Sequence, residues 1–468
     1  MRRRRRWAIL TCVKPWRARI APVVCVATLA ACEGLIGADF NRVAREEESP
    51  DDANASDASA ASDRADDAPP ADARSKDAGG DAQVSLPECG DRGGLDVTAS
   101  WPMPGFCPTR PNRSAAPSLA APKLRRRVAL APTTGSSTFT WFASSVAVDG
   151  AGVAYGLVTE LADSSLRNYV VAIGGTKELW RTDVSGSPAY VVPEVGAPVL
   201  AAGGPIYVAA GNALVALSRG GVVNWTKQLG TAVGAPLILG DGTVVVTAGA
   251  SVRAFASDGS DAWTFALDGS AAFFHGAVTA TATGSLVVVQ GAALGSTDAR
   301  LVSFNPGGTF NWTKPLASKP STVPAVDGQG QIVVRSLTGL SVFTSTGTVV
   351  ATKGAGSGNA GALFPALTTT GAWFGDGFDL LFLDASNGAT TATPLSGRRG
   401  GLIATGDGDL VFAHVKTPDA RVVSLAPDGA ERWAVPIDLS SADLQAPALG
   451  ADGSVYVPFA DTLYVLGP

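Results

Sequence analysis

The sequence predicts an all-β fold, an eight-bladed β-propeller of four-stranded blades that is preceded by a disordered tether. Its 55 glycines and 30 prolines, with only 16% charged residues, are typical of turn-rich β-structure. Two different strand-turn-strand patterns alternate along residues 123–468. The second pattern recurs with a period near 42 residues, and a period of this length with four short strands per unit indicates propeller blades.

The first pattern is a short apolar strand, a turn containing Gly or Asp-Gly, and a second apolar strand, as in GAPLILGDGTVVVTA. Clear copies begin at Gly196, Gly234, Val323 and Ala446, and weaker copies begin at Ser144, His275, Phe364 and Gly400. These eight copies predict the first two strands of eight blades. The Asp-Gly pairs between strands favour type I′ turns, which require positive φ.

In the second pattern, Asp-Gly or Gly-Gly is followed about four residues later by tryptophan, as in the related segments GVVNWTK and GTFNWTK. The tryptophans are Trp180, Trp225, Trp263, Trp312 and Trp433. Ala351 and Ala392 stand at two further positions of the period, so that successive slots lie 45, 38, 49, 39, 41 and 41 residues apart. One large aromatic residue per blade at a fixed phase predicts packing between neighbouring sheets, since a ligand-stacking role would need several tryptophans at one pocket.

Closure of the ring needs one more outer strand, because the last repeat ends in DTLYVLGP without one. The segment LRRRVAL, from Leu124 to Leu130, fits this role and places Arg126 in the tryptophan slot. An N-terminal strand that completes the C-terminal blade would leave no open sheet edge between the first and last blades. Without this strand the ring would have seven blades.

The N-terminal residues predict export and a lipid anchor. A basic segment precedes the apolar run from Ile20 to Ala30, which is too short to span a bilayer. The sequence Leu-Ala-Ala-Cys ending at Cys32 resembles the lipobox of bacterial lipoproteins, which implies a signal peptide of residues 1–31 and acylation of Cys32. Glu33, in place of the Asp that retains lipoproteins in the inner membrane, favours the outer membrane. The alternative is an ordinary secretory signal with a chance cysteine.

Residues 32–85 and 86–122 predict a tether and a lead-in before the propeller of residues 123–468. Residues 33–85 carry 14 acidic and 5 basic residues and almost no large apolar ones, so we expect a disordered, self-repelling segment. If Cys32 is lipidated, Cys89 and Cys107 are the two thiols left in the mature chain. In an oxidising compartment they should form a disulfide, and they lack the C-x-x-C spacing of a redox pair.

The blade patterns resemble the pyrroloquinoline-quinone-like (PQQ-like) β-propeller repeats, a family of eight-bladed quinoprotein dehydrogenases and BamB-like outer-membrane assembly lipoproteins. The segment SWPMPGFCPTRPNRS, from Ser100 to Ser114, also resembles the lead-in that often precedes such repeats, although Gly105-Phe106-Cys107 departs from it. The resemblance covers roughly residues 100–468. It implies the propeller fold but not one activity, because propellers host many unrelated functions.

The sequence offers no recognisable catalytic constellation. The candidate acids and bases are His275, His414, Asp327, Asp376 and Asp384, and each is more simply explained as a strand or turn residue. The segment GDGD, from Gly406 to Asp409, is a fragment of a calcium loop that lacks the further acids and terminal Glu. The adjacent cysteine pair common in quinoprotein dehydrogenases is absent from the sequence. We therefore predict no catalytic residue, no metal and no cofactor.

Together these features predict a non-enzymatic, lipid-anchored monomer at the bacterial cell envelope that binds a protein or a glycan, with BamB-like service in outer-membrane assembly as a narrower version. The acidic mature chain disfavours nucleic acid as a partner. The alternative is an oxidoreductase that depends on pyrroloquinoline quinone.

Overall fold

The computed structural model describes residues 89–133, 137–162, 165–185, 196–267, 276–291, 299–316, 318, 322–336, 339–354, 365–376, 379–384, 389–395, 397–416, 419–438 and 444–468. The chain divides into two units, Met1–Gly79 and Gly80–Pro468. All described residues belong to the second unit. The signal peptide, the acylated Cys32 and the whole tether of residues 32–85 that the sequence predicts lie outside the described residues.

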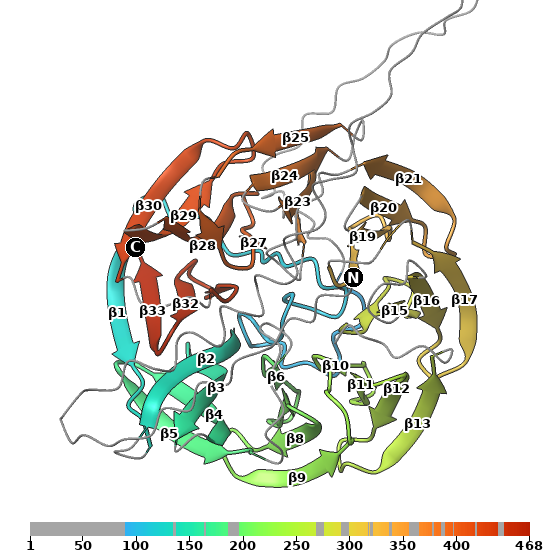
Figure 1. The fold of residues 1–468 in the computed structure, drawn as a ribbon, viewed down its shortest axis with the longest axis horizontal. Coiled ribbons are helices and arrows are strands. Elements are labelled where there is room, and N and C mark those ends of the chain that lie inside the picture. The colour runs from blue at the N-terminus through green and yellow to red at the C-terminus, as the bar shows by residue number, and fades with distance from the viewer. Residues whose placement is uncertain are drawn as a thin grey trace, which may run out of the picture. The chain divides into compact units, whose positions relative to one another are not determined.

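Eight antiparallel sheets form a closed ring, which confirms the eight-bladed propeller of four-stranded blades (Figure 1). Blade 1 contains β2 (Ser137–Val148), β3 (Ala154–Ala162), β4 (Ser165–Gly174) and β5 (Lys177–Asp183). Blade 2 contains β6 (Val199–Leu200), β7 (Ile206–Ala210), β8 (Ala213–Leu217) and β9 (Val223–Gln228). Blade 3 contains β10 (Leu237–Ile238), β11 (Val244–Ala248), β12 (Ser251–Phe255) and β13 (Asp261–Ala266). Blade 4 contains β14 (Thr279–Ala280), β15 (Leu286–Gln290), β16 (Arg300–Phe304) and β17 (Phe310–Pro315).

In blades 1 to 4 the first strand of each blade lies nearest to the axis and the fourth lies outermost, and the second half of the ring has the same arrangement (Figure 1). Blade 5 contains β18 (Ala325–Val326), β19 (Ile332–Ser336), β20 (Gly339–Phe343) and β21 (Val349–Gly354). Blade 6 contains β22 (Ala366–Leu367), β23 (Gly371–Asp376), β24 (Asp379–Asp384) and β25 (Thr390–Thr393). Blade 7 contains β26 (Arg398–Arg399), β27 (Ile403–Ala404), β28 (Leu410–Lys416), β29 (Asp419–Leu425) and β30 (Glu431–Ile437). It has one short strand more than the other blades, because β26 and β27 both pair with β28. Blade 8 contains β31 (Ala448–Leu449), β32 (Val455–Phe459), β33 (Thr462–Gly467) and β1 (Lys123–Ala129).

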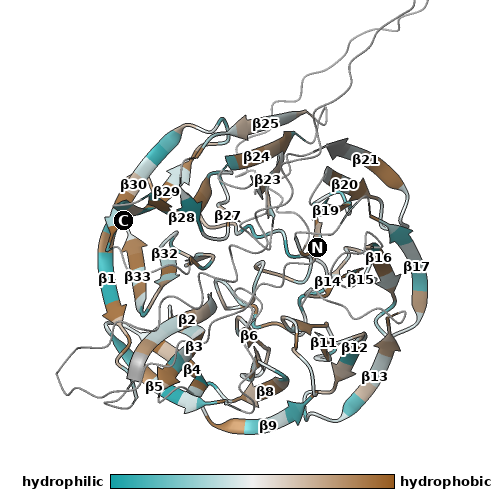
Figure 2. Cartoon of the chain, viewed as in Figure 1, coloured by the Kyte–Doolittle hydropathy of each residue, from teal (hydrophilic) through white to brown (hydrophobic). Residues whose placement is uncertain are grey.

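Burial follows the position of each strand within its blade. The second and third strands of blade 2, β7 and β8, are buried at every residue, whereas the outer strand β9 alternates between exposed and partly buried residues. A middle strand is covered on both faces by the neighbouring blades, so it consists of continuous apolar residues. An outer strand faces solvent along one edge, and the outer strands accordingly mix hydrophilic and hydrophobic residues (Figure 2).

The hydrophobic core of the protein lies between blades. One cluster joins blades 1 and 2, a second joins blades 2 to 4, and others join blades 4 and 5, 5 and 6, and 6 and 7. The largest cluster joins blades 7, 8 and 1 to residues of the lead-in. A single four-stranded sheet has no core of its own, so each blade depends on its neighbours for burial.

Strand β1 closes the ring by pairing antiparallel with β33, with Arg126 opposite Val465 and Val128 opposite Leu463. This pairing is the predicted use of the segment from Leu124 to Leu130. The seven-bladed alternative is therefore wrong. The first and last strands of blade 8 come from opposite ends of the propeller sequence, so unfolding either end exposes an edge of the other.

The Asp-Gly turns differ from the predicted type I′ geometry. At Asp241-Gly242, Gly242 has a φ of 85°, but Asp241 is not among the described non-glycine residues with positive φ. The Gly242 amide donates to Leu239 O at 2.9 Å, and the Thr243 amide donates to the Asp241 carboxylate at 2.9 Å. This is a longer loop in which the carboxylate fixes the turn and only glycine is left-handed, so the type I′ prediction is wrong.

No helix formed by the described residues is long and apolar enough to cross a membrane.

The closing strand generates a test of ring closure. Val128 is 5% exposed and faces Leu463, so Val128→Ala should lower the free energy of unfolding by about 1 to 3 kcal/mol through lost apolar burial. Urea-induced unfolding followed by tryptophan fluorescence measures this change. Arg125→Ala, at an exposed position of the same strand, is the matched control. Equal urea midpoints for the two variants would contradict a closing role for β1.

Candidate functional site: the axial plug and the blade slots

Residues 89–119, here called the axial plug, lie at the centre of the ring (Figure 1). Inner-strand amides of six blades donate hydrogen bonds of 2.7 to 2.9 Å to carbonyls of the plug. The pairs are Val148 to Trp101, Leu200 to Pro102, Ala280 to Pro108, Val326 to Thr109, Leu367 to Pro111 and Ala404 to Asn112. Each donor is the last residue of its inner strand. The plug therefore satisfies backbone donors that would otherwise face the axis unpaired.

The plug also packs against the turns between the first and second strands of several blades. A Cβ placed on Gly94 would lie 1.9 Å from Leu239 O in blade 3, and one placed on Gly406 in blade 7 would lie 2.5 Å from Ala115 O. A Cβ on Gly150 in blade 1 would lie 2.6 Å from Thr98 O. Glycine is required here because two backbones meet at van der Waals distance. Because these turns all lie at the same end of antiparallel blades, the plug closes the axis at that end.

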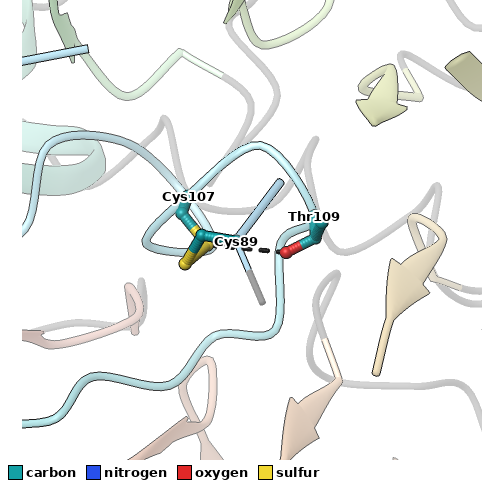
Figure 3. The surroundings of a disulfide bond; sticks show 3 residues. All are labelled: Cys89, Cys107 and Thr109. Carbon is teal, nitrogen blue, oxygen red and sulfur yellow. Dashed lines mark hydrogen bonds between the residues drawn. A yellow bond between two sulfur atoms is a disulfide. The ribbon is translucent and has the colours of Figure 1, made fainter. Parts of the chain in front are cut away.

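A disulfide between Cys89 and Cys107 ties the start of the plug to its middle, with a Cα–Cα distance of 5.5 Å (Figure 3). Cys107 is fully buried, and its Sγ lies 3.5 Å from Oγ1 of Thr109. The loop that the disulfide closes contains Trp101, whose ring centroid lies 5.3 Å from that of Phe106. The bond restricts the unfolded plug, which lowers the entropy lost when the plug enters the ring.

Two arginines of the plug are completely buried. Arg110 donates through Nε to Val278 O at 2.9 Å and through Nη1 to Pro104 O at 2.8 Å, and burial lowers its pKa to about 9. Arg113 is 1% exposed and donates through Nη2 to Gly406 O at 3.2 Å. Arg110 also has a left-handed φ of 52°, as do Phe106 (78°) and Asn112 (52°). Such strained backbone persists only where the surrounding contacts over-determine it.

The tryptophan slots join each blade to the next. The indole Nε1 of Trp180 donates to Arg219 O of blade 2 at 2.9 Å, and that of Trp225 donates to Ser257 O of blade 3 at 2.9 Å. Trp312 donates in the same way to Ser345 O of blade 5 at 3.2 Å. Each ring lies against the outer turn of the next blade and is partly buried in the cluster between the two sheets.

The glycines of these turns make room for the rings. A Cβ on Gly221 would lie 2.7 Å from the ring of Trp180, and one on Gly347 would lie 2.8 Å from Trp312. Gly259 and Gly308 meet Trp225 and Trp263 at similar distances. The Gly and the Trp of one pattern thus contact different neighbours. The Gly packs against the tryptophan ring of the preceding blade, and the Trp packs against the turn of the following blade.

The slots without tryptophan have other contacts. Arg126 donates through Nη1 to Gly175 O of blade 1 at 2.9 Å, which is the same kind of bond to the outer turn of the next blade. Ala392 is exposed, and its neighbour Thr393 is the side chain nearest to Gly429 of blade 7. Trp433 is buried, yet its Nε1 has no hydrogen-bond partner. The next blade offers it no outer turn, because β33 and β1 are not consecutive in the chain.

Comparison with known proteins agrees with this architecture. Residues 166–373, from β4 of blade 1 to β23 of blade 6, match the family model described as outer membrane protein assembly factor BamB. Among solved structures, BamB from Moraxella catarrhalis matches with a TM-score of 0.51 and 13% identity over 74% of this chain and 98% of that one. The C-terminal WD40 domain of Sif2 matches with a TM-score of 0.50 and 10% identity, again over 74% and 98%.

The chain is a PQQ-like β-propeller repeat protein. No curated protein sequence matches it significantly. At identities of 10 to 13%, the two structural matches establish the fold of this PQQ-like propeller and not its activity.

The candidate acids and bases of the PQQ-like propeller are dispersed. Asp327 accepts the amides of Gln329 and Gln331 at 2.9 and 2.8 Å, and burial raises its pKa. His414 is buried in β28 with its ring 6.4 Å from that of Phe412. Asp384 is the last residue of β24. His275 and the side chain of Asp376 lie outside the described residues. The described candidates therefore come from three separate blades, with Asp327 in blade 5, Asp384 in blade 6 and His414 in blade 7.

The cofactor set of quinoprotein dehydrogenases does not fit the described part of this PQQ-like propeller. The cysteines near the axis are separated by 18 residues and hold the plug, so they do not form an adjacent pair. In the GDGD segment, Asp407 accepts the Ser118 amide at 2.7 Å and Asp409 lies 3.3 Å from Nε of Arg432. Within the described ranges, no group of three His, Cys, Asp or Glu residues could hold a metal ion.

Sequence reasoning missed the plug. The segment from Ser100 to Ser114 resembles the lead-in of PQQ-like repeats, but this resemblance does not place it on the axis of the ring. Its three prolines before Thr109 were the available signal, because a residue without an amide donor cannot continue a regular sheet ladder, although its carbonyl can still accept from another strand.

The fit of glycine to tryptophan generates a double-mutant test. Gly347→Ala should lower the free energy of unfolding by about 2 to 4 kcal/mol, because the new methyl meets Trp312 and φ is 81°. In a Trp312→Ala background the same change should cost about 1 to 2 kcal/mol, since only the backbone strain remains. Urea unfolding of all four proteins measures the coupling.

Gly284→Ala is the matched control for this cycle. Its φ is 85° and nothing lies within 4 Å of the added Cβ, so only the backbone term applies. Equal costs for Gly347→Ala with and without Trp312 would show that the ring does not require the glycine.

Proposed function

We propose that this PQQ-like propeller is a lipid-anchored scaffold at the bacterial cell envelope that binds a protein partner through its outer rim. Support for protein binding comes from the family model, which is named for an outer-membrane assembly factor. Support for the envelope comes from the lipobox-like sequence that ends at Cys32. Service in outer-membrane assembly is the narrower form of this proposal.

The observation that carries the proposal is an apolar rim of four exposed side chains at one repeated position. Leu124, Val223, Phe310 and Val349 each lie two residues before the slot of their outer strand, and they are 44, 40, 53 and 54% exposed. Val222 and Val350, next to Val223 and Val349, are 67 and 51% exposed, and Leu179, next to the slot residue Trp180 of blade 1, is 48% exposed.

Large apolar residues gain nothing from exposure on an outer strand, and charged or small ones occupy this position elsewhere. Glu178, Asp261, Thr390 and Glu431 stand two residues before the slots of blades 1, 3, 6 and 7. Blades 4 and 5 share a hydrophobic cluster and are neighbours in the ring (Figure 1), so Phe310 and Val349 lie on successive outer strands. An apolar surface with polar surroundings is the composition of a protein-binding site more than of a glycan site.

The rim is accessible to a partner at the end of the ring where the plug blocks the axis. The plug occupies the axis at the end where the outer turns lie, and its backbone engages six inner strands. A partner that approaches this end therefore meets the rim and the turns first. Outer strands additionally present unpaired backbone groups to which an extended segment can add.

The partner can be identified by crosslinking in intact cells with the full-length chain carrying a tag after Pro468, followed by mass spectrometry. The double variant Phe310→Ser, Val349→Ser should reduce recovery of the specific partner by about tenfold or more, because two apolar contacts of an interface centre are lost. Thr390→Ala, at the same position of blade 6, should leave recovery unchanged. Undiminished recovery with the double variant would contradict the rim, and binding of isolated glycans with no protein partner would contradict protein binding.

The anchor has its own test. Wild type should label with radioactive palmitate and sediment with membranes, because two or more acyl chains give stable anchoring. Cys32→Ser should lose the label and appear in the soluble envelope fraction. A Cys25→Ser variant serves as the control, since this residue would leave with the signal peptide. Membrane association that survives Cys32→Ser would contradict the lipid anchor.

A further inference from the structure

Arg113 has an environment that its protein contacts do not explain. Its side chain is 1% exposed, and its single observed hydrogen bond joins Nη2 to Gly406 O at 3.2 Å. The Nε and Nη1 atoms are buried and have no hydrogen-bond partner. By contrast, Arg110 three residues earlier uses all three nitrogens for carbonyl oxygens.

The nearby carboxylates are engaged elsewhere. Asp407 and Asp409 flank the turn whose Gly406 carbonyl accepts from Arg113. Asp407 accepts the Ser118 amide at 2.7 Å, and Asp409 is paired with Arg432 at 3.3 Å. Arg113 forms no ion pair in the structure with either of them. Its charge is therefore buried without a described counter-charge, and burial lowers its pKa.

A buried guanidinium in this state is costly for two separate reasons. Each unsatisfied buried donor loses the hydrogen bond that it made to water, and the uncompensated charge loses its solvation. A bound water would satisfy a donor without neutralising the charge. An oxyanion would do both, and its oxygens suit the planar donors of arginine.

We propose that Arg113 binds a small inorganic oxyanion of the phosphate or sulfate class where the axial plug meets the turn of blade 7 at Gly406. Nε–H and Nη1–H point to different edges of the guanidinium, so one small anion accepts from one of them together with the second N–H of Nη2, while the first N–H of Nη2 stays on Gly406. It enters as the plug docks, and it thereby links insertion of the plug to the anion concentration. This site is independent of the proposed rim and of any partner.

The test is the phosphate dependence of unfolding of the full-length protein at constant ionic strength, with sodium chloride as the balancing salt. The wild-type urea midpoint should rise with phosphate and saturate, because a ligand that binds the folded state stabilises it in proportion to occupancy. Arg113→Met should keep only the gradual, unsaturated rise that excluded salts give any protein. Arg125→Met, which removes an exposed arginine, should behave as wild type. The same saturating response in Arg113→Met would overturn the proposal.

Two further measurements keep the test decisive if Arg113→Met does not fold. Arg113→Lys keeps the charge but loses the planar donors, and its phosphate affinity should fall by about tenfold or more. A crystal grown in selenate should show an anomalous peak within hydrogen-bond distance of Nε or Nη1. A water alone at this place would overturn the proposal, and so would a selenate peak without any phosphate dependence of unfolding, which would mark an adventitious ion only.

Discussion

The hydrogen bonds between the axial plug and the inner strands are the contacts on which the rest of the ring depends. Most inner strands are only two residues long, and each has a sheet partner on one side alone. Carbonyls of Trp101, Pro102, Pro108, Thr109, Pro111 and Asn112 accept the amides of six of these strands. A short segment with several prolines can serve strands from different directions, because it need not follow the register of any one sheet. The plug thus joins the axis-facing edges of six blades into one connected centre.

The outer half of the ring is held by a second repeated contact, in which the tryptophan or arginine of a slot docks on the outer turn of the next blade in five of the eight blades. Trp180, Trp225 and Trp312 reach a turn carbonyl with the indole N–H and fill the space above a turn glycine. Arg126 makes an equivalent bond with its guanidinium in the blade where the two chain segments meet. The hydrophobic clusters lie between blades, so these contacts fix the angle at which one sheet meets the next.

These two layers of contacts constrain where the protein can bind other molecules. The axis is committed to the plug at one end, and the slots are committed to neighbouring blades. Positions two residues before the slots lie at the edge of each blade and carry side chains of different kinds, from the ion-paired Asp261 and Glu431 to the exposed Phe310. The four large apolar residues at this position, Leu124, Val223, Phe310 and Val349, are therefore more informative about function than the tryptophans beside them.

The sequence by itself determined the architecture, because period and strand pattern are local properties. The spacing of Trp180, Trp225 and Trp312 gave the blade length, and the missing last strand pointed to Leu124–Leu130 and to Arg126 as its slot residue. The type I′ turn that the sequence predicts at Asp241-Gly242 is wrong. The turn type depends on the length of the loop between the paired strands, and the pairing is not visible in the sequence.

Only the tertiary structure decided which contacts the lead-in makes. Arg110 and Arg113 look alike in the sequence, yet one is fully satisfied by carbonyls of other blades and the other keeps two unpaired donors. The acceptors of Arg110 lie 125 or more residues away for two of its bonds. The distinction arises from the convergence of distant backbones on the axis, and no local pattern in the sequence specifies that convergence.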